Sequence, residues 1–170
     1  MPMYVKESGE GMDAVKAAIT FLKTHRVLIG IPQAAPSKHG GITNAELAFI
    51  HTMGSPINRI PPRPFLEPAI EEAKDNITGR MKASVEAAVS GDIGTAMNEL
   101  DKAGQYGENA AKDYFTGGHF EPNAGITIEG GWMRNRVSGK PVFVKGKSST
   151  VPLIDTGDLR GSITHVIEGE

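Results

Sequence analysis

Residues 60–70, with the sequence IPPRPFLEPAI, constrain the fold of this chain more than any other segment. Three of the first five are prolines, and each proline fixes its own φ and moves the preceding residue into extended geometry. Glu67 and Pro68 then favour a helix start, because proline suits the first turn and acids are stabilised there. Arg63 and Phe65 therefore lie on a stiff arm that leads into a helix. Such an arm is typical of a contact surface, or of a connector whose Phe65 is buried in its own core.

The longest periodic segment of the chain follows this arm. Residues 67–89 predict one helix, whose apolar stripe consists of Ile70, Ala73, Ile77, Met81, Val85 and Ala88. Gly79 interrupts the pattern at a cost of about 1 kcal/mol, which is too little to break so long a helix.

A second long helix is predicted over residues 93–116, after a Ser-Gly-Asp turn at residues 90–92 that ends in a helix cap. Its apolar positions are Ile93, Met97, Leu100, Ala103 and Ala110. Gly104 and Gly107 weaken its middle, so a kink or a break is expected there. Together with residues 67–89, this segment predicts an αα-hairpin.

Shorter elements precede the arm. Residues 11–26 predict an amphipathic helix with an apolar stripe of Met12, Val15, Ile19 and Leu22. Residues 27–31 form an apolar run that ends at a proline, which indicates a buried strand. Thr43 and Glu46 have the spacing of a capping box, in which each residue satisfies the backbone of the other. The helix that they begin is expected to end at Gly54.

The last third of the chain, after Gly117, is rich in glycine and proline. Residues 126–128, 141–144 and 160–167 have the composition of short strands, and residues 130–150 are expected to form a long glycine-rich loop or arm. The predicted fold class is α+β in a single domain over residues 1–170. Its small, mainly antiparallel sheet would comprise residues 27–31, the 126–144 region and 160–167, packed against the long helices.

Composition excludes several kinds of site. The chain has no cysteine, which removes disulfides, thiolate metal ligands and cysteine nucleophiles. Its net charge of −2 argues against a protein that binds nucleic acid by neutralising phosphates. No apolar run approaches the roughly 18 residues of a membrane span, and the N-terminus does not have the pattern of a signal peptide. None of the five histidines is paired at i, i+4 spacing, so neither a metal nor a cofactor is expected.

Residues 155–157 form the Asp-Thr-Gly triplet of aspartic proteases. That mechanism needs two carboxylates that share a proton, and a lobe of β-structure after the triplet. Too little chain follows Gly157 to build such a lobe. The alternative is a turn, in which Asp155 bonds to the backbone ahead of it and Gly157 supplies a positive φ. Thr156 or Asp158 would then cap a short turn through Leu159.

A basic stretch extends from Arg134 to Lys147, and Trp132 and Phe143 lie beside it. Aromatic side chains in a cationic groove can stack on bases, which is one interpretation. It predicts steeply salt-dependent DNA binding that is lost when the cations are neutralised. The other interpretation is a loop that docks on an acidic neighbour. Trp132, the only tryptophan, would be the natural anchor of such a contact.

Three stretches of the chain form an ordered pattern. The first is residues 44–54, a helix that ends at a glycine, with Thr-Met at 52–53 where an acid and an aromatic residue are usual. The second is residues 60–69, in which Arg-Pro-Phe-Leu precedes a helix. The third comprises EPNA at 121–124, a threonine, a basic loop, and PLIDTGDLR with SIT at 152–164. In this order they resemble the small neck, tail-completion and virion-morphogenesis proteins of tailed bacteriophages and prophages. The basic loop, residues 130–150, is longer and richer in glycine than in that group.

The resemblance implies a non-enzymatic subunit at the head–tail junction, a neck or tail-completion protein, or alternatively a tail terminator that caps the tail tube. It implies a ring, most often of six copies, with genomic DNA passing through the lumen without sequence-specific binding. Neighbouring neck and tail-tube proteins would be the other partners. The protein would be made in the bacterial host cytoplasm and located in the virion. Residues 60–66 and 130–150 are candidates for the two faces of a head-to-tail contact. The candidate assembly residues are Arg63, Phe65, Trp132, Arg134, Arg136, Asp155, Thr156, Gly157 and Leu159. The resemblance further implies that Phe65 anchors the start of the long helix against the core and that Arg63 makes a polar contact with an acid, in the same subunit or a neighbour. Arg63→Ala is therefore expected to weaken assembly more than folding.

Overall fold

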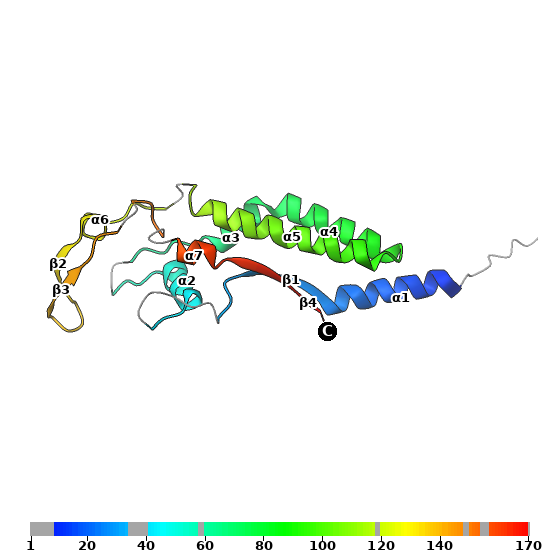
Figure 1. Cartoon of the computed structure of the whole chain (residues 1–170), viewed down its shortest axis with the longest axis horizontal. Coiled ribbons are helices and arrows are strands. Elements are labelled where there is room, and N and C mark those ends of the chain that lie inside the picture. Colours follow the sequence, from blue (N-terminus) through cyan, green and yellow to red (C-terminus); the bar gives the residue numbers. More distant parts are fainter. Residues whose placement is uncertain are drawn as a thin grey trace, which may run out of the picture. The chain divides into compact units, whose positions relative to one another are not determined.

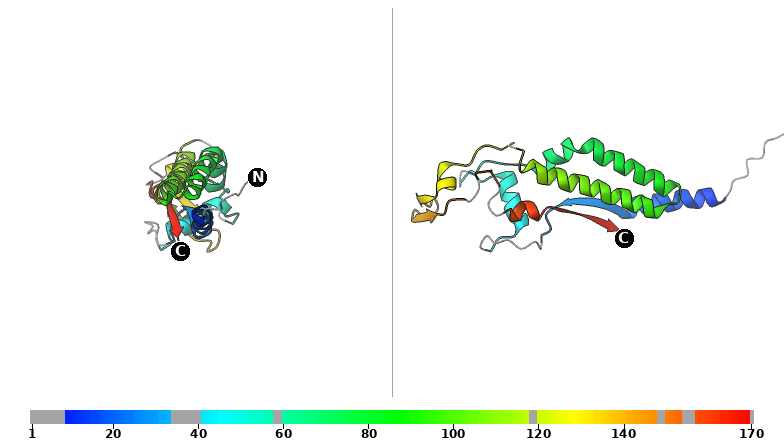
Figure 2. Two further views of the ribbon diagram at one scale, coloured as in Figure 1. Left: turned by 90° about the vertical axis from the view of Figure 1, so that its right-hand side faces the viewer. Right: turned by 45° about the horizontal axis from the view of Figure 1, so that its top comes forward.

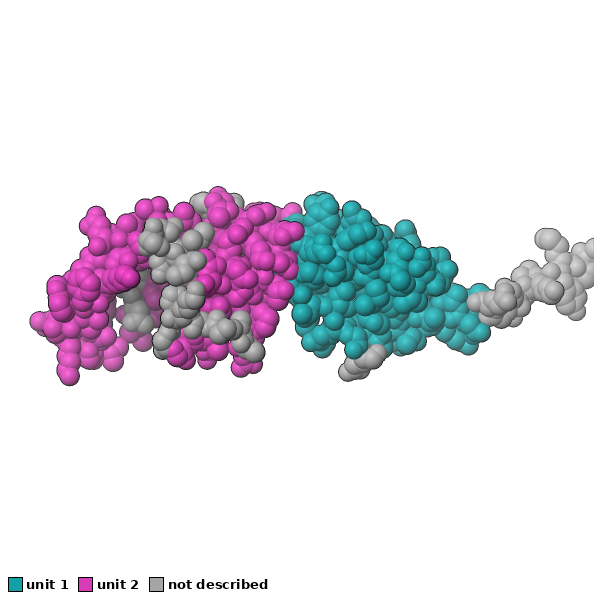
Figure 3. Space-filling view, viewed as in Figure 1, with its two compact units in different colours: residues 1–29, 73–107, 165–170 teal, residues 30–72, 108–164 magenta. Residues whose placement is uncertain are grey.

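The computed structural model describes residues 9–33, 41–57, 60–117, 120–147, 150–153 and 157–169. The chain divides into two compact units (Figure 3). Unit 1 comprises residues 1–29, 73–107 and 165–170, and unit 2 comprises residues 30–72 and 108–164. Each unit is described by itself. The predicted α+β class is confirmed, because long helices pack with small antiparallel sheets.

Unit 1 is built on the helices α1 (Gly9–Thr24), α4 (Lys74–Val89) and the first part of α5 (Ile93–Tyr114). The strand β1 (His25–Gly30) pairs with β4 (Thr164–Gly169) (Figure 1). Across this pair the Arg26 guanidinium donates from both Nε and Nη2 to Glu168 Oε2, at 2.8 and 2.6 Å. The buried core of the unit consists of Ala18, Phe21, Ala88, Ala96 and Leu100.

The expected αα-hairpin is formed by α4 and α5, which lie side by side in both ribbon views (Figure 2). Its turn uses Gly91 at φ +85°, and Asp92 caps α5 by accepting hydrogen bonds from the Thr95 amide and hydroxyl. The two helices approach through small residues. Ser84, which is fully buried, donates to the Ala96 carbonyl at 2.8 Å. The predicted cap and turn are therefore confirmed.

Three expectations about these helices are wrong. The helix predicted over residues 67–89 is divided at Ala73, whose φ of −88° and ψ of 0° interrupt the helical ladder between α3 (Leu66–Glu72) and α4. Gly104 and Gly107 neither kink nor break α5, because both glycines lie on its buried face, where packing holds the helix. Within the predicted stripe, Met81 and Val85 are exposed, since close approach of the helices favours the smaller Ser84 and Ala88.

Unit 2 contains α2 (Asn44–Met53), α3, the end of α5, the short helices α6 (Gly125–Glu129) and α7 (Asp158–Gly161), and a hairpin of β2 (Gly131–Arg134) and β3 (Pro141–Val144). Its buried core consists of Phe65, Ala69, Ala111, Phe115, Leu153, Leu159 and Ile163. The capping box of α2 is present, and Gly54 ends that helix at φ +71°, as predicted.

The single predicted sheet is instead two separate two-stranded sheets, β1–β4 and β2–β3. Residues 126–128, expected as a strand, belong to the helical turn α6, which begins with Thr127 and Ile128 amides donating to the Ala124 carbonyl. The hairpin lies within residues 130–150, where a long loop was expected. Its strand β3 confirms the strand predicted over residues 141–144, whereas β2 was not predicted. The last strand also starts later than predicted, because residues 158–161 form α7.

Candidate functional site

The β2–β3 hairpin presents an exposed aromatic pair. Its antiparallel register places Trp132 opposite Phe143 and Arg134 opposite Pro141, so these four side chains share one face. The Trp132 and Phe143 rings meet edge to face, with 5.5 Å between their centroids. Trp132 is nevertheless 72% exposed and Phe143 58% exposed. Large aromatic side chains contribute most of the energy in protein contacts, so this pair is a candidate anchor for a partner.

The turn of the hairpin is stabilised by its own hydrogen bonds. Asn135 Oδ1 accepts from the Val137 and Ser138 amides at 2.9 and 2.8 Å. The Asn135 amide donates to the Lys140 carbonyl at 2.8 Å, and Gly139 has the positive φ of +68° that the turn requires. The exposed Val137 is therefore displayed on a defined turn.

Two glycines allow the base of the hairpin to lie close to α6. A Cβ on Gly130 would lie 2.6 Å from the Gly146 nitrogen, and a Cβ on Gly146 would lie 2.5 Å from the Ile128 carbonyl oxygen. The Lys147 amide donates to the Thr127 carbonyl at 3.0 Å. Only glycine permits so close an approach of these two backbone segments. The high glycine content of this region therefore serves close packing as well as loop formation.

The charge of the hairpin is entirely positive. Residues 130–147 contain no acidic residue, and their exposed cations are Arg134, Arg136, Lys140 and Lys145. Arg134 lies two residues after Trp132 on the same strand, so the guanidinium and the indole project from the same face. Trp132, Arg134 and Arg136 are all exposed on this segment, and their predicted role in assembly stays a prediction.

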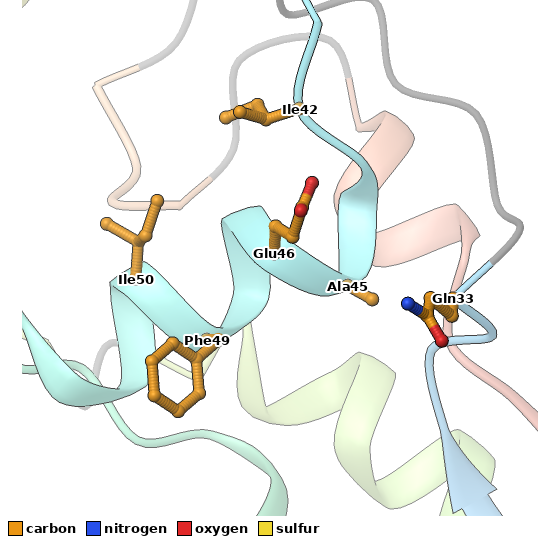
Figure 4. Close-up of a pocket in the computed structure, with 6 residues that line it drawn as sticks. All are labelled: Gln33, Ile42, Ala45, Glu46, Phe49 and Ile50. Atoms are coloured by element: carbon orange, nitrogen blue, oxygen red, sulfur yellow. The ribbon is translucent and has the colours of Figure 1, made fainter.

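A shallow apolar pocket lies beside α2, also in unit 2 (Figure 4). Its volume is about 590 Å³, and it is lined by Gln33, Ile42, Ala45, Glu46, Phe49 and Ile50. Phe49 is 67% exposed, and Met53, about one turn later on α2, is exposed as well. This pocket was not predicted from the sequence. One signal is nevertheless present in the sequence, because Phe49 and Met53 are large apolar residues at i, i+4 spacing on α2. Another face of the same helix packs Leu47 and Ala48 against the core.

The capping box fixes a negative charge at this pocket. Glu46 Oε2 accepts from the Thr43 amide at 2.7 Å and from the Thr43 hydroxyl at 3.0 Å. The Glu46 amide donates in return to Thr43 Oγ1 at 3.2 Å. These bonds, the backbone amide first, lower the pKa of Glu46 from its ordinary value of 4.5. Glu46 is therefore an anion in the pocket wall at neutral pH.

The stiff arm places Phe65 and Arg63 inside unit 2. Phe65 is 3% exposed and its ring lies 4.6 Å from that of Phe115, centroid to centroid, so its predicted role as an anchor in the core is confirmed. Arg63 is 7% exposed and donates from Nη2 to the main-chain carbonyl of Glu121 at 3.1 Å. The expected polar contact is made, but this hydrogen bond joins Arg63 to a main-chain carbonyl and not to a carboxylate. As a buried side chain, Arg63 is not displayed on an exposed contact surface of this unit.

The arm also explains the glycine at the end of α2. A Cβ on Gly54 would lie 2.8 Å from both the Ile60 carbonyl oxygen and the Pro62 nitrogen. The Arg63 amide donates to the His51 carbonyl at 2.7 Å, and the Ser55 and Ile60 backbones bond to each other. These backbone hydrogen bonds therefore hold the arm against the end of α2.

The Asp-Thr-Gly turn is described only in part. Gly157 has the predicted positive φ, +82°, and precedes α7, and Leu159 is buried in the core of unit 2. Asp155 and Thr156 lie outside the described residues, so the predicted hydrogen bonds of that turn stay predictions. Arg160 donates from Nε to the Lys112 carbonyl at 2.7 Å, which ties α7 to the end of α5 within unit 2.

Unit 1 carries a separate exposed apolar surface on α1. The predicted stripe of Met12, Val15, Ile19 and Leu22 is exposed, whereas Ala18 and Phe21 from another face of the helix enter the core. The amphipathic helix is therefore present, but its apolar stripe is not the face that enters the core. Periodicity identifies an apolar face, but it does not determine which face of a helix the rest of the unit covers.

Comparison of the chain with protein-family models, with curated proteins and with solved structures finds no match in any of the three. Within the described ranges, no helix is long and apolar enough to cross a membrane. The same residues contain no group of three or more acidic or histidine side chains arranged to hold a metal ion. The exposed hairpin, the α2 pocket and the α1 stripe are therefore the candidate functional surfaces.

Proposed function

We propose that this chain is a structural subunit of the head–tail junction of a tailed bacteriophage or prophage, a neck or tail-completion protein that assembles as a ring around the DNA channel. The ordered resemblance of residues 44–54, 60–69 and 121–164 to that group supports the proposal. The observation that carries it is the exposed Trp132–Phe143 pair on a hairpin whose turn and base are both fixed.

An aromatic pair of this size is unfavourable in water, and it favours burial against a partner. The α1 stripe of unit 1 is a second apolar surface of different composition. A closed ring is built from head-to-tail contacts, in which each subunit uses two different surfaces. A chain that exposes different apolar surfaces on its two units meets that requirement. The proposed partners are further copies of the chain and the adjoining neck and tail-tube proteins of the virion.

The test is the assembly state of the purified full chain. Light scattering coupled to gel filtration, over a wide range of concentration, is expected to give one discrete species with several times the mass of 18.1 kDa. Negative-stain microscopy of that species is expected to show annular particles with a central channel. A chain that stays monomeric throughout, alone and with its tail-tube protein, would overturn the proposal.

A tail terminator belongs to the same class and would also form a ring. The two roles differ in what the ring binds. A terminator stops the growth of tail tubes when it is added to polymerising tube protein, whereas a neck protein leaves tube length unchanged and binds filled heads. Measurement of tube lengths by electron microscopy separates the two.

A further inference from the structure

Unit 2 carries one protruding and one hollow apolar feature. The protruding feature is the β2–β3 hairpin, with Trp132 and Phe143 on one face. The hollow feature is the α2 pocket, whose apolar wall includes Ile42, Phe49 and Ile50 (Figure 4). Its volume of about 590 Å³ is sufficient for an indole ring. Ligand pockets bury flat, largely apolar groups and orient them with a few polar atoms, and this pocket has polar side chains in Gln33 and Glu46.

The charges of the two features are opposite. The hairpin contains four exposed cations and no acid, whereas residues 41–57 contain Glu46 as their only charged Asp, Glu, Lys or Arg. Arg134 projects from the same face as Trp132, so a partner that receives the indole also meets the guanidinium. A hairpin packed on the hairpin of another copy would instead bring like charges together, which disfavours that contact.

We propose that the hairpin of one copy docks on the α2 surface of the next copy, with Trp132 in the pocket and Arg134 facing Glu46. The occupant of the pocket is thus a second copy of this chain. Because the hairpin and the pocket are different surfaces, the contact is head-to-tail and repeats from copy to copy until the ring closes. This inference rests on the proposed ring, and it assigns the residues that form one of the ring contacts.

The absence of cysteine in the chain permits a cross-linking test. Met133 lies next to Trp132 on the hairpin, and Met53 lies about one helical turn after Phe49 on α2. Both are exposed, and neither is a residue that the proposal requires. One preparation carries Met133→Cys and the other Met53→Cys. A bis-maleimide linker is used because a disulfide requires Cα atoms within about 7 Å, and the docked indole holds the two chains farther apart.

The mixture is expected to give a covalent dimer, and neither preparation alone is expected to do so. A matched control replaces Met53→Cys with Met12→Cys, an exposed methionine on α1, and no cross-link to Met133→Cys is expected. Adding Trp132→Ala to the Met133→Cys chain should reduce the linked fraction at least tenfold. Val166→Ala, at an exposed apolar site on β4, should leave it unchanged.

The outcomes separate the inference from the proposed function. A ring in light scattering without a 133–53 cross-link, or with a 133–12 cross-link instead, overturns the docking mode and leaves the ring intact. A chain that forms no oligomer overturns the proposed function itself. Fluorescence anisotropy with duplex DNA is the third measurement. Salt-dependent DNA binding that is lost when Arg134, Arg136 and Lys145 are neutralised, with the oligomer unchanged, would assign the hairpin to DNA and overturn the docking mode.

Discussion

The side chain of His165 lies against Gly104 so closely that a Cβ on residue 104 would be 2.3 Å from the His165 Cδ2 atom. In the same place His165 Nε2 lies 3.2 Å from Asp101 Oδ1, less than one turn earlier on α5. Gly104 therefore permits β4 to approach α5 within unit 1. The glycine that weakens the helix in isolation is required by the packing of the strand on it.

Gly104→Ala is expected to lower the free energy of unfolding by about 1–3 kcal/mol, because the added methyl group overpacks the His165 contact. Urea denaturation at neutral pH measures the change. Gly79→Ala is the matched control, since Gly79 lies inside α4 with no atom within 4 Å of its added Cβ. It should raise stability by up to about 1 kcal/mol through helix propensity.

The same contact can be tested in a double-mutant cycle. In a His165→Ala background the space beside residue 104 is empty, so Gly104→Ala should no longer destabilise and should resemble Gly79→Ala. An equal loss of stability from Gly104→Ala with and without the His165 ring would show that the ring contact is not the cause.

Phe65→Ala is expected to lower the free energy of unfolding by about 3–5 kcal/mol, because it removes a buried ring that packs on Phe115. Phe49→Ala is the matched control. The Phe49 ring is mostly exposed, so Phe49→Ala should change the free energy of unfolding by no more than about 0.5 kcal/mol. The same substitution should weaken assembly. The two variants are compared by thermal unfolding and by light scattering. Similar stability of both variants would contradict the assigned positions of the two rings.

Features that depend on neighbouring residues were predictable from the sequence. The Thr43–Glu46 capping box, the Asp92 cap and the positive φ of Gly157 each depend on contacts or sterics within a few residues. Such local rules act in the same way whatever the rest of the chain does.

Features that depend on distant partners were not predictable in the same way. The Ile-Thr-Ile run at 126–128 has the composition of a strand, but β3 pairs with β2 and the run forms a helical turn. Periodicity did not reveal that α1 buries Phe21 and exposes Ile19. The α2 pocket was not predicted either. It is formed by two separate segments of the chain, Gln33 and the 42–50 region.

Arg63→Ala is expected to destabilise the monomer by about 1–3 kcal/mol, because a buried side chain that bonds to the Glu121 carbonyl is lost. This revises the expectation, drawn from sequence, that the substitution weakens assembly more than folding. Arg63→Met retains most of the apolar stem, and it also removes the buried Nε donor, which has no acceptor among the described residues. It should therefore cost less than Arg63→Ala. A stable Arg63→Ala monomer that fails to assemble would restore the original role.

The stability of α2 is expected to fall at acid pH through Glu46. The amide and the hydroxyl of Thr43 hold the pKa of Glu46 below 4.5 in the folded chain. A carboxyl whose pKa is lower when folded stabilises the fold fully at pH above its unfolded value, and this contribution is lost as pH falls through the folded value. The stability difference between the wild-type chain and Glu46→Gln should thus be constant near neutral pH and shrink below pH 4.5.

Thr43→Val provides a second measurement of the same contact. It removes the hydroxyl but keeps the backbone amide, which is the larger cause of the lowered pKa. The pKa of Glu46, measured by NMR titration of its carboxyl carbon, should therefore rise only part of the way to its ordinary value. A complete return to that value would mean that the hydroxyl, and not the amide, holds the charge at the wall of the pocket. A difference between wild type and Glu46→Gln that does not change with pH would show that the capping carboxylate contributes nothing to the stability of α2.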